Sequence, residues 1–114
     1  MDVRREILLP TTREDAWDAL TEPSRLEEWF ATEVELDLRE GGAAVFRWGD
    51  GDARRAEVVT VEDEERLVLR FEDDGVVDLR LADDAEGTRV VVRESSPQWG
   101  TALELSALAS WATA

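Results

Sequence analysis

The sequence predicts a single α+β domain in which an antiparallel sheet packs against helices. Three patterns predict this class. Two short helical segments follow directly on a first strand, six further short segments alternate apolar and polar residues between turns, and the last segment is apolar at helical spacing. At 114 residues the chain suits one domain over residues 1–114 and leaves no room for a second.

The first strand is predicted over residues 3–9. Val3, Ile7 and Leu9 place apolar side chains on one face of an extended segment. Pro10 lacks the amide hydrogen that would continue a ladder, so we expect the strand to end there.

Two short helices are predicted next. Thr12 and Asp15 form a capping-box-like start for the first helix. The residue before Pro23 is biased away from helical angles, so the first helix should end near Thr21 and the second should begin at Pro23. The positions expected to face the core are Ala16, Trp17 and Leu20, then Leu26, Trp29 and Phe30.

Six further strands should follow, joined by short turns as in an antiparallel meander. Glycine pairs at residues 41–42 and within residues 49–52 mark the first two turns. The residues predicted to face inward are Val34, Leu36 and Leu38; Ala44, Phe46 and Trp48; Ala56, Val58 and Val61; Leu67, Leu69 and Phe71; Val77, Leu79 and Leu81; and Thr88, Val90 and Val92.

Residues 98–113 predict a final helix of about 24 Å, which is long enough to lie across a sheet. Glu104 is its only charged residue. A helix that is apolar nearly all round is normally covered on more than one side. Its outer residues should therefore contact either the two N-terminal helices or a second protein chain.

Composition limits the classes of partner. The net charge of −15 makes the surface repel phosphate backbones and anionic lipids, so we expect neither a nucleic acid nor a membrane as partner. The sequence contains no apolar run long enough to span a membrane and no secretory leader pattern. Because it also has no cysteine, the predicted location is the cytoplasm.

The side chains that the chain lacks exclude several kinds of chemistry. Without His, Cys, Lys or Tyr, it cannot form a Ser-His pair, a thiolate nucleophile, a lysine Schiff base or an imidazole metal site. It has no phosphate-binding glycine motif, and its acidic turns are typical of solvated surface. We therefore expect no cofactor and no metal site.

Several residues at characteristic spacing identify a family resemblance. They are Ile7, Pro10, Trp17, Ala19, Leu20, Thr21, Pro23, Leu26 and Trp29, with later signatures at residues 41–42, 46–48, 66–71 and 87–90. This pattern resembles the START-like (SRPBCC), helix-grip superfamily, and within it the activator of heat-shock protein 90 ATPase homologues. The resemblance implies a curved antiparallel sheet of six to seven strands wrapped around the C-terminal helix.

The resemblance also implies a cavity between sheet and helix, where family members hold hydrophobic small molecules. Its predicted lining is Phe46, Trp48, Leu69, Phe71, Val77, Leu79, Trp99, Leu103 and Ser106. Aromatic walls with few hydroxyl groups suit an apolar ligand. The same alternation would also build a filled core, so both an open cavity and a solid core remain consistent with the sequence.

One charged pair could add a polar group to this face. If the first and last strands pair as in the family, one register places Arg5 opposite Glu94, Ile7 opposite Val92, and Leu9 opposite Val90. The pair could orient a ligand or act as acid and base. It could equally be a structural ion pair at the end of the sheet.

Three functions follow from these observations. The first is a START-like domain that binds a small hydrophobic molecule without catalysis, and we adopt it as the main hypothesis. The second is a polyketide cyclase-like or hydrolase-like enzyme that works with Glu94 and Arg5. The third is a protein-interaction module, either a chaperone-ATPase activator or a homodimer or other complex formed through Leu105, Leu108 and Ala112.

Overall fold

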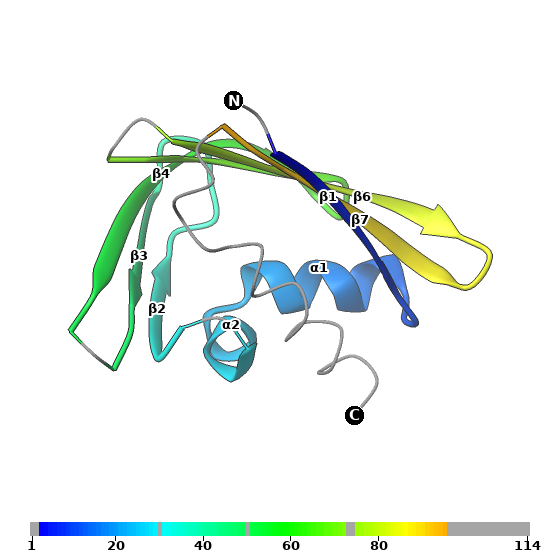
Figure 1. The fold of residues 1–114 in the computed structure, drawn as a ribbon, viewed down its shortest axis with the longest axis horizontal. Coiled ribbons are helices and arrows are strands. Elements are labelled where there is room, and N and C mark those ends of the chain that lie inside the picture. Colours follow the sequence, from blue (N-terminus) through cyan, green and yellow to red (C-terminus); the bar gives the residue numbers. More distant parts are fainter. Residues whose placement is uncertain (1–2, 30, 50, 73–74, 96–114) are drawn as a thin grey trace.

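Seven antiparallel strands form one curved sheet, and two short helices lie on its concave side (Figure 1). The structure is a computed structural model that describes residues 3–29, 31–49, 51–72 and 75–95. Along the chain the elements are β1 (Val3–Leu9), α1 (Arg13–Thr21), α2 (Pro23–Trp29), β2 (Glu33–Leu36), β3 (Ala43–Arg47), β4 (Ala53–Glu62), β5 (Arg66–Phe71), β6 (Val76–Asp84) and β7 (Gly87–Glu94). The strand order is β1-β7-β6-β5-β4-β3-β2, so the predicted α+β meander is confirmed. The helix predicted over residues 98–113 lies outside the described residues.

The start of α1 has the predicted cap. The Thr12 hydroxyl accepts a hydrogen bond from the amide of Asp15 at 3.1 Å, which satisfies one of the free amide groups of the first turn. The Thr11 hydroxyl donates to the Asp15 carboxylate at 2.8 Å. Glu22 has extended backbone angles and ends α1, and α2 begins at Pro23 as predicted.

The core lies between the concave face of the sheet and the helices. The inward sheet positions that are at most 8% exposed are Leu9, Val34, Ala44, Phe46, Val58, Leu67, Leu69, Phe71, Val77, Leu79, Leu81, Thr88, Val90, Val92 and Glu94. Trp17 and Leu20 of α1 and Leu26 of α2 are buried with them. The side chains of Trp29 and Phe30 lie outside the described residues. The alternation of the sequence therefore predicted the buried face of every strand except at one strand end.

That strand end is in β2. We expected the strand to continue with Leu38 facing inward, but β2 ends at Leu36 and Leu38 is 38% exposed. The amide of Arg39 donates to the carbonyl of Asp37 at 2.8 Å, and this tight turn takes the chain out of the ladder. The alternation of residues 34–38 continues past the point where the chain turns, so this part of the prediction was wrong.

A β-bulge explains the uneven spacing of apolar residues in β4. The pairing with β5 shifts between Val58 and Thr60, so Val59 is the extra residue. After the bulge, Val61 pairs with the buried Leu67 and packs against the core. The spacing of three between Val58 and Val61 is therefore compatible with one buried face.

Contacts at one end of the strands fix the register of β1 against β7. Leu9 is opposite Thr88, and the Thr88 hydroxyl donates to the carbonyl of Thr11 at 2.9 Å. Gly87 has φ +145°, and a Cβ at this position would lie 2.0 Å from the carbonyl oxygen of Leu9. Only glycine allows the two backbones to approach this closely.

Candidate functional site

The concave face of the sheet carries the sheet residues that we predicted to line a cavity. Phe46 of β3, Leu69 and Phe71 of β5, and Val77 and Leu79 of β6 are all buried. Trp48, just beyond the end of β3, is partly buried against the core. Trp99, Leu103 and Ser106 lie outside the described residues.

An aromatic pair lies at one part of this face. The ring centroids of Phe46 and Phe71 are 6.2 Å apart, and their planes are inclined by 38°. This tilted arrangement is within the favourable range for two aromatic rings. The pair joins β3 to β5 across β4.

Glu94 is the one acidic residue of the described strands that is buried on the concave face. It is the last residue of β7, where it is opposite Val3 of β1 and Val77 of β6. The residue is 2% exposed, and its Oε1 atom has no hydrogen-bond partner among the described residues. A buried carboxylate oxygen without a partner is uncommon, because it loses its hydration without gaining a protein contact.

The predicted pairing of Arg5 with Glu94 is wrong. Arg5 is opposite Val92, and Glu94 is opposite Val3, so the register differs by two residues from the one we expected. Arg5 still shares a strand face with Ile7 and Leu9, but it is exposed. A shift of two residues keeps every side chain on its face, so alternation alone could not distinguish the two registers.

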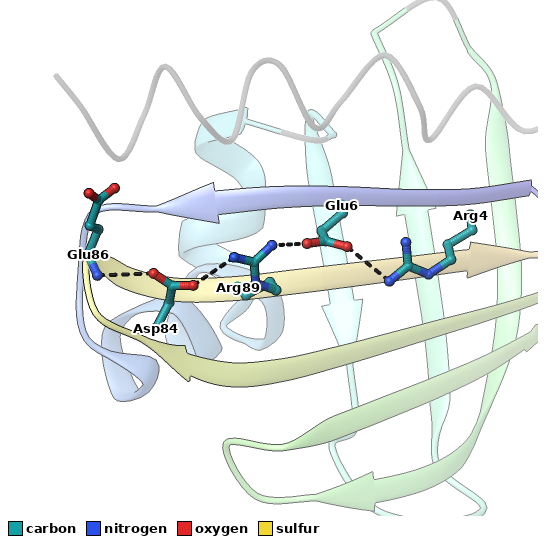
Figure 2. A network of polar contacts seen from close by, with 5 residues as sticks. All are labelled: Arg4, Glu6, Asp84, Glu86 and Arg89. Carbon is teal, nitrogen blue, oxygen red and sulfur yellow. Dashed lines mark hydrogen bonds and ion pairs between the residues drawn. The ribbon is translucent and has the colours of Figure 1, made fainter.

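The convex face carries a network of charges that the sequence did not lead us to expect (Figure 2). Arg89 of β7 bridges Glu6 of β1 and Asp84 of β6, with 2.7 Å between Arg89 Nη2 and Asp84 Oδ2. Glu6 also accepts a hydrogen bond from Arg4 at 2.9 Å. The hydrogen bonds from Arg89 and then Arg4 lower the pKa of Glu6, and those from Arg89 and the Glu86 amide lower the pKa of Asp84.

Asp78 forms the second charge cluster on this face. It accepts hydrogen bonds from Arg66 Nε at 3.2 Å and Arg66 Nη2 at 3.0 Å, and Arg80 lies 3.4 Å from it. Arg66 and Arg80 are directly opposite each other on β5 and β6, so Asp78 separates two like charges. Burial acts to raise the pKa of Asp78, but the hydrogen bonds from the two arginines hold it below its usual value of 3.8.

We expect Asp78→Asn to lower the free energy of unfolding at pH 7 by about 1–2 kcal/mol, because two guanidinium groups lose the negative charge between them and one of its two acceptor oxygens. The folded pKa of Asp78 is below its ordinary 3.8, so its stabilising effect is complete above that value and is lost as the pH falls through the lower folded pKa. Urea unfolding of wild type and variant between pH 7 and pH 2 measures the difference, which should shrink below about pH 4. Asp83→Asn is the control, since that side chain is 78% exposed. A wild-type advantage that stays constant down to pH 2 would contradict this account.

Two shallow depressions are lined by described residues. One of about 260 Å³ lies where β4 meets β5, and Phe71 is its only predicted site residue. The other, about 400 Å³ in volume, lies on the convex face near Arg66, Arg80 and Arg89. The arginines of the second depression are engaged by Asp78, Asp84 and Glu6, so their charges are already paired.

The described part of the chain has neither a metal-binding cluster nor a membrane-spanning helix. Within it, no group of three or more acidic residues has an arrangement that could hold a metal ion. Neither of the two described helices is long and apolar enough to cross a membrane.

Comparisons with known proteins give one family. A family model described as "Activator of Hsp90 ATPase homolog 1-like protein" matches residues 10–111. A comparison with curated protein sequences found no match.

Several solved structures share the fold. Protein MLL2253 of Mesorhizobium loti has a TM-score of 0.86 at 20% identity, with 96% of this chain and 95% of that chain covered. The AHSA1-like protein of Aeromonas hydrophila has a TM-score of 0.78 at 22% identity, with 97% and 84% covered. DynU16, a protein in the dynemicin biosynthetic locus, has a TM-score of 0.77 at 28% identity; 96% of this chain is covered, but only 42% of DynU16.

Proposed function

The chain belongs to the family of Activator of Hsp90 ATPase homolog 1-like proteins, within the START-like superfamily, and from this premise we propose that it binds a small apolar molecule. The observation that carries the proposal is the apolar composition of the concave face. Aromatic and aliphatic side chains from three strands lie on it together, at Phe46, Leu69, Phe71, Val77 and Leu79. Such a surface, with few polar groups, is typical of sites for apolar ligands.

The similarity to DynU16 also supports a small-molecule role. That protein is in a biosynthetic locus, and this chain spans less than half of its length. The similarity therefore supports binding of a small organic molecule by this domain. It does not indicate a particular reaction.

Binding without catalysis is the better proposal for the described residues. The enzyme hypothesis required Arg5 beside Glu94, but Arg5 is exposed and opposite Val92. General acid–base chemistry needs groups within hydrogen-bond reach of the reacting atoms. No described polar side chain forms a hydrogen bond with Glu94 Oε1, so we propose a ligand-binding role for Glu94.

The protein-interaction hypothesis and the cytoplasmic location stay predictions. A homodimer or another protein complex would use Leu105, Leu108 and Ala112, which lie outside the described residues, and the role of chaperone-ATPase activator is a separate alternative. Loss of a complex on Leu105→Glu would favour this alternative over ligand binding.

An added ring at Val77 tests the proposed ligand site. Val77 is 5% exposed on the concave face, so Val77→Phe should occupy space that a ligand needs. We expect it to reduce the affinity for the neutral dye Nile red about tenfold or more, a difference of roughly 1.4 kcal/mol. If the face is open, unfolding stability should change little, whereas overpacking a filled core costs about 1–3 kcal/mol. Fluorescence titration and urea unfolding give the two quantities.

Val91→Phe is the matched control, because Val91 is on the same sheet but on the convex face. It should leave dye binding unchanged. Absence of saturable dye binding to the wild type, or destabilisation by Val77→Phe without any effect on binding, would contradict the proposal.

A further inference from the structure

Glu94 differs from every other buried group of the described residues. Among the described residues, two buried side-chain atoms lack a hydrogen bond: Arg13 Nε and Glu94 Oε1. Arg13 Nε is 3.9 Å from carboxylate oxygens of Glu64 and of Asp83, so it has charge partners. Glu94 has no such partner among the described residues.

The neighbours of Glu94 in the sheet are apolar. Val3 and Val77 are opposite it, and Val92 precedes it on the same face of β7. Arg5 is the only described cation on this face of β1, and it forms no ion pair with Glu94. The arginines next to Glu94 in sequence and register, Arg93 and Arg4, are on the opposite face.

The cost of this arrangement is large. Taking a carboxylate out of water is unfavourable unless a hydrogen bond or an opposite charge compensates for the lost hydration. The carboxylates of the convex face are instead paired, as Asp78 is with Arg66 and Asp84 with Arg89. The chain has 13 arginines, yet none donates a hydrogen bond to Oε1 of Glu94, the most deeply buried carboxylate of the described residues.

We propose that Glu94 Oε1 accepts a hydrogen bond from a protonated amine carried by the apolar ligand of the concave face. This inference rests on the function proposed above and names the class of ligand. An ammonium group supplies both the missing donor and the missing positive charge, and charge-assisted hydrogen bonds are about twice as strong as neutral ones. The net charge of −15 further favours a cation over an anion of the same shape.

Three probes of one shape and different head groups test this inference. They are 2-naphthylmethylamine, 2-naphthylmethanol and 2-naphthoate, titrated calorimetrically into the full chain. In the wild type, the amine should bind about 10- to 100-fold more tightly than the alcohol, and the carboxylate should bind most weakly. Titration in 0.5 M NaCl reduces general attraction to the acidic surface.

Glu94→Gln keeps the shape of the side chain and removes its charge. In this variant, the affinity for the amine should fall to that for the alcohol, and the affinity for the alcohol should change little. Glu33→Gln is the matched control, because Glu33 is exposed on β2 and its loss changes the net charge equally. Circular dichroism confirms that both variants are folded.

The selectivity of the wild type is a test that does not depend on any variant. Equal affinity for amine and alcohol, or amine selectivity that survives Glu94→Gln, would overturn the inference and leave the proposed apolar site standing. Failure of all three probes and of Nile red to bind the wild type would overturn the proposed function as well.

Discussion

Gly87→Ala should lower the free energy of unfolding by about 3–5 kcal/mol, at the upper end of single substitutions. The new Cβ would lie 2.0 Å from the carbonyl oxygen of Leu9 and 3.0 Å from the Cα of Pro10. Both are backbone atoms, so no side-chain rotation can relieve the contact. The φ angle of +145° adds strain for any residue with a side chain. Urea unfolding at pH 7 measures this loss as a lower midpoint concentration.

Gly41→Ala separates the two causes. Gly41 also has positive φ, at +84°, but a Cβ there would meet no atom within 4 Å. Its substitution should cost only the backbone strain of about 1 kcal/mol. Equal destabilisation by the two variants would contradict a steric role for the Leu9 carbonyl.

Trp17→Ala should destabilise the protein by about 3–5 kcal/mol, because it removes the largest side chain between α1 and the sheet. Trp17 is 4% exposed, and α1 contacts β6 and β7. The carbonyl of Trp17 also accepts a hydrogen bond from the buried Thr21 hydroxyl at 2.7 Å, a contact that the substitution leaves in place. The predicted loss is therefore one of packing, measurable by urea unfolding at pH 7.

Trp17→Phe is the matched control and should recover more than half of this loss, since it keeps an aromatic ring in the core. Leu8→Ala, at a convex-face position that is 37% exposed, should cost well under 1 kcal/mol. A cost below about 1 kcal/mol for Trp17→Ala would contradict the packing of α1 against the sheet.

Local chemistry and alternation allowed most of the described fold to be predicted. Thr12, Pro10 and Pro23 place the boundaries of β1, α1 and α2, because caps and prolines act on the backbone within a few residues. Alternation predicted which side chains of each strand face the core. It failed at Leu38, because the turn after Leu36 depends on a hydrogen bond between Arg39 and Asp37 that alternation does not reveal.

The register and the ion pairs could not be predicted in the same way. The β1–β7 register depends on tertiary contacts of Gly87 and Thr88 with the end of β1. Arg5 and Glu94 were predicted to share a face, and they do, but only the register shows that they are not opposite each other. For the same reason, the ion pairs of Arg89 with Glu6 and Asp84 could not be predicted from alternation.

A methyl-resolved NMR titration tests most directly whether the concave face binds an apolar molecule. Val91 and Val92 are neighbours on β7 with opposite orientations, since Val92 is 1% exposed on the concave face and Val91 borders the convex depression. On titration with 2-naphthylmethanol, we expect saturable shifts at the methyl groups of Val92, Val77 and Leu79, and none at Val91. Absence of shifts at the concave methyl groups, or equal shifts at Val91, would contradict ligand binding at this face.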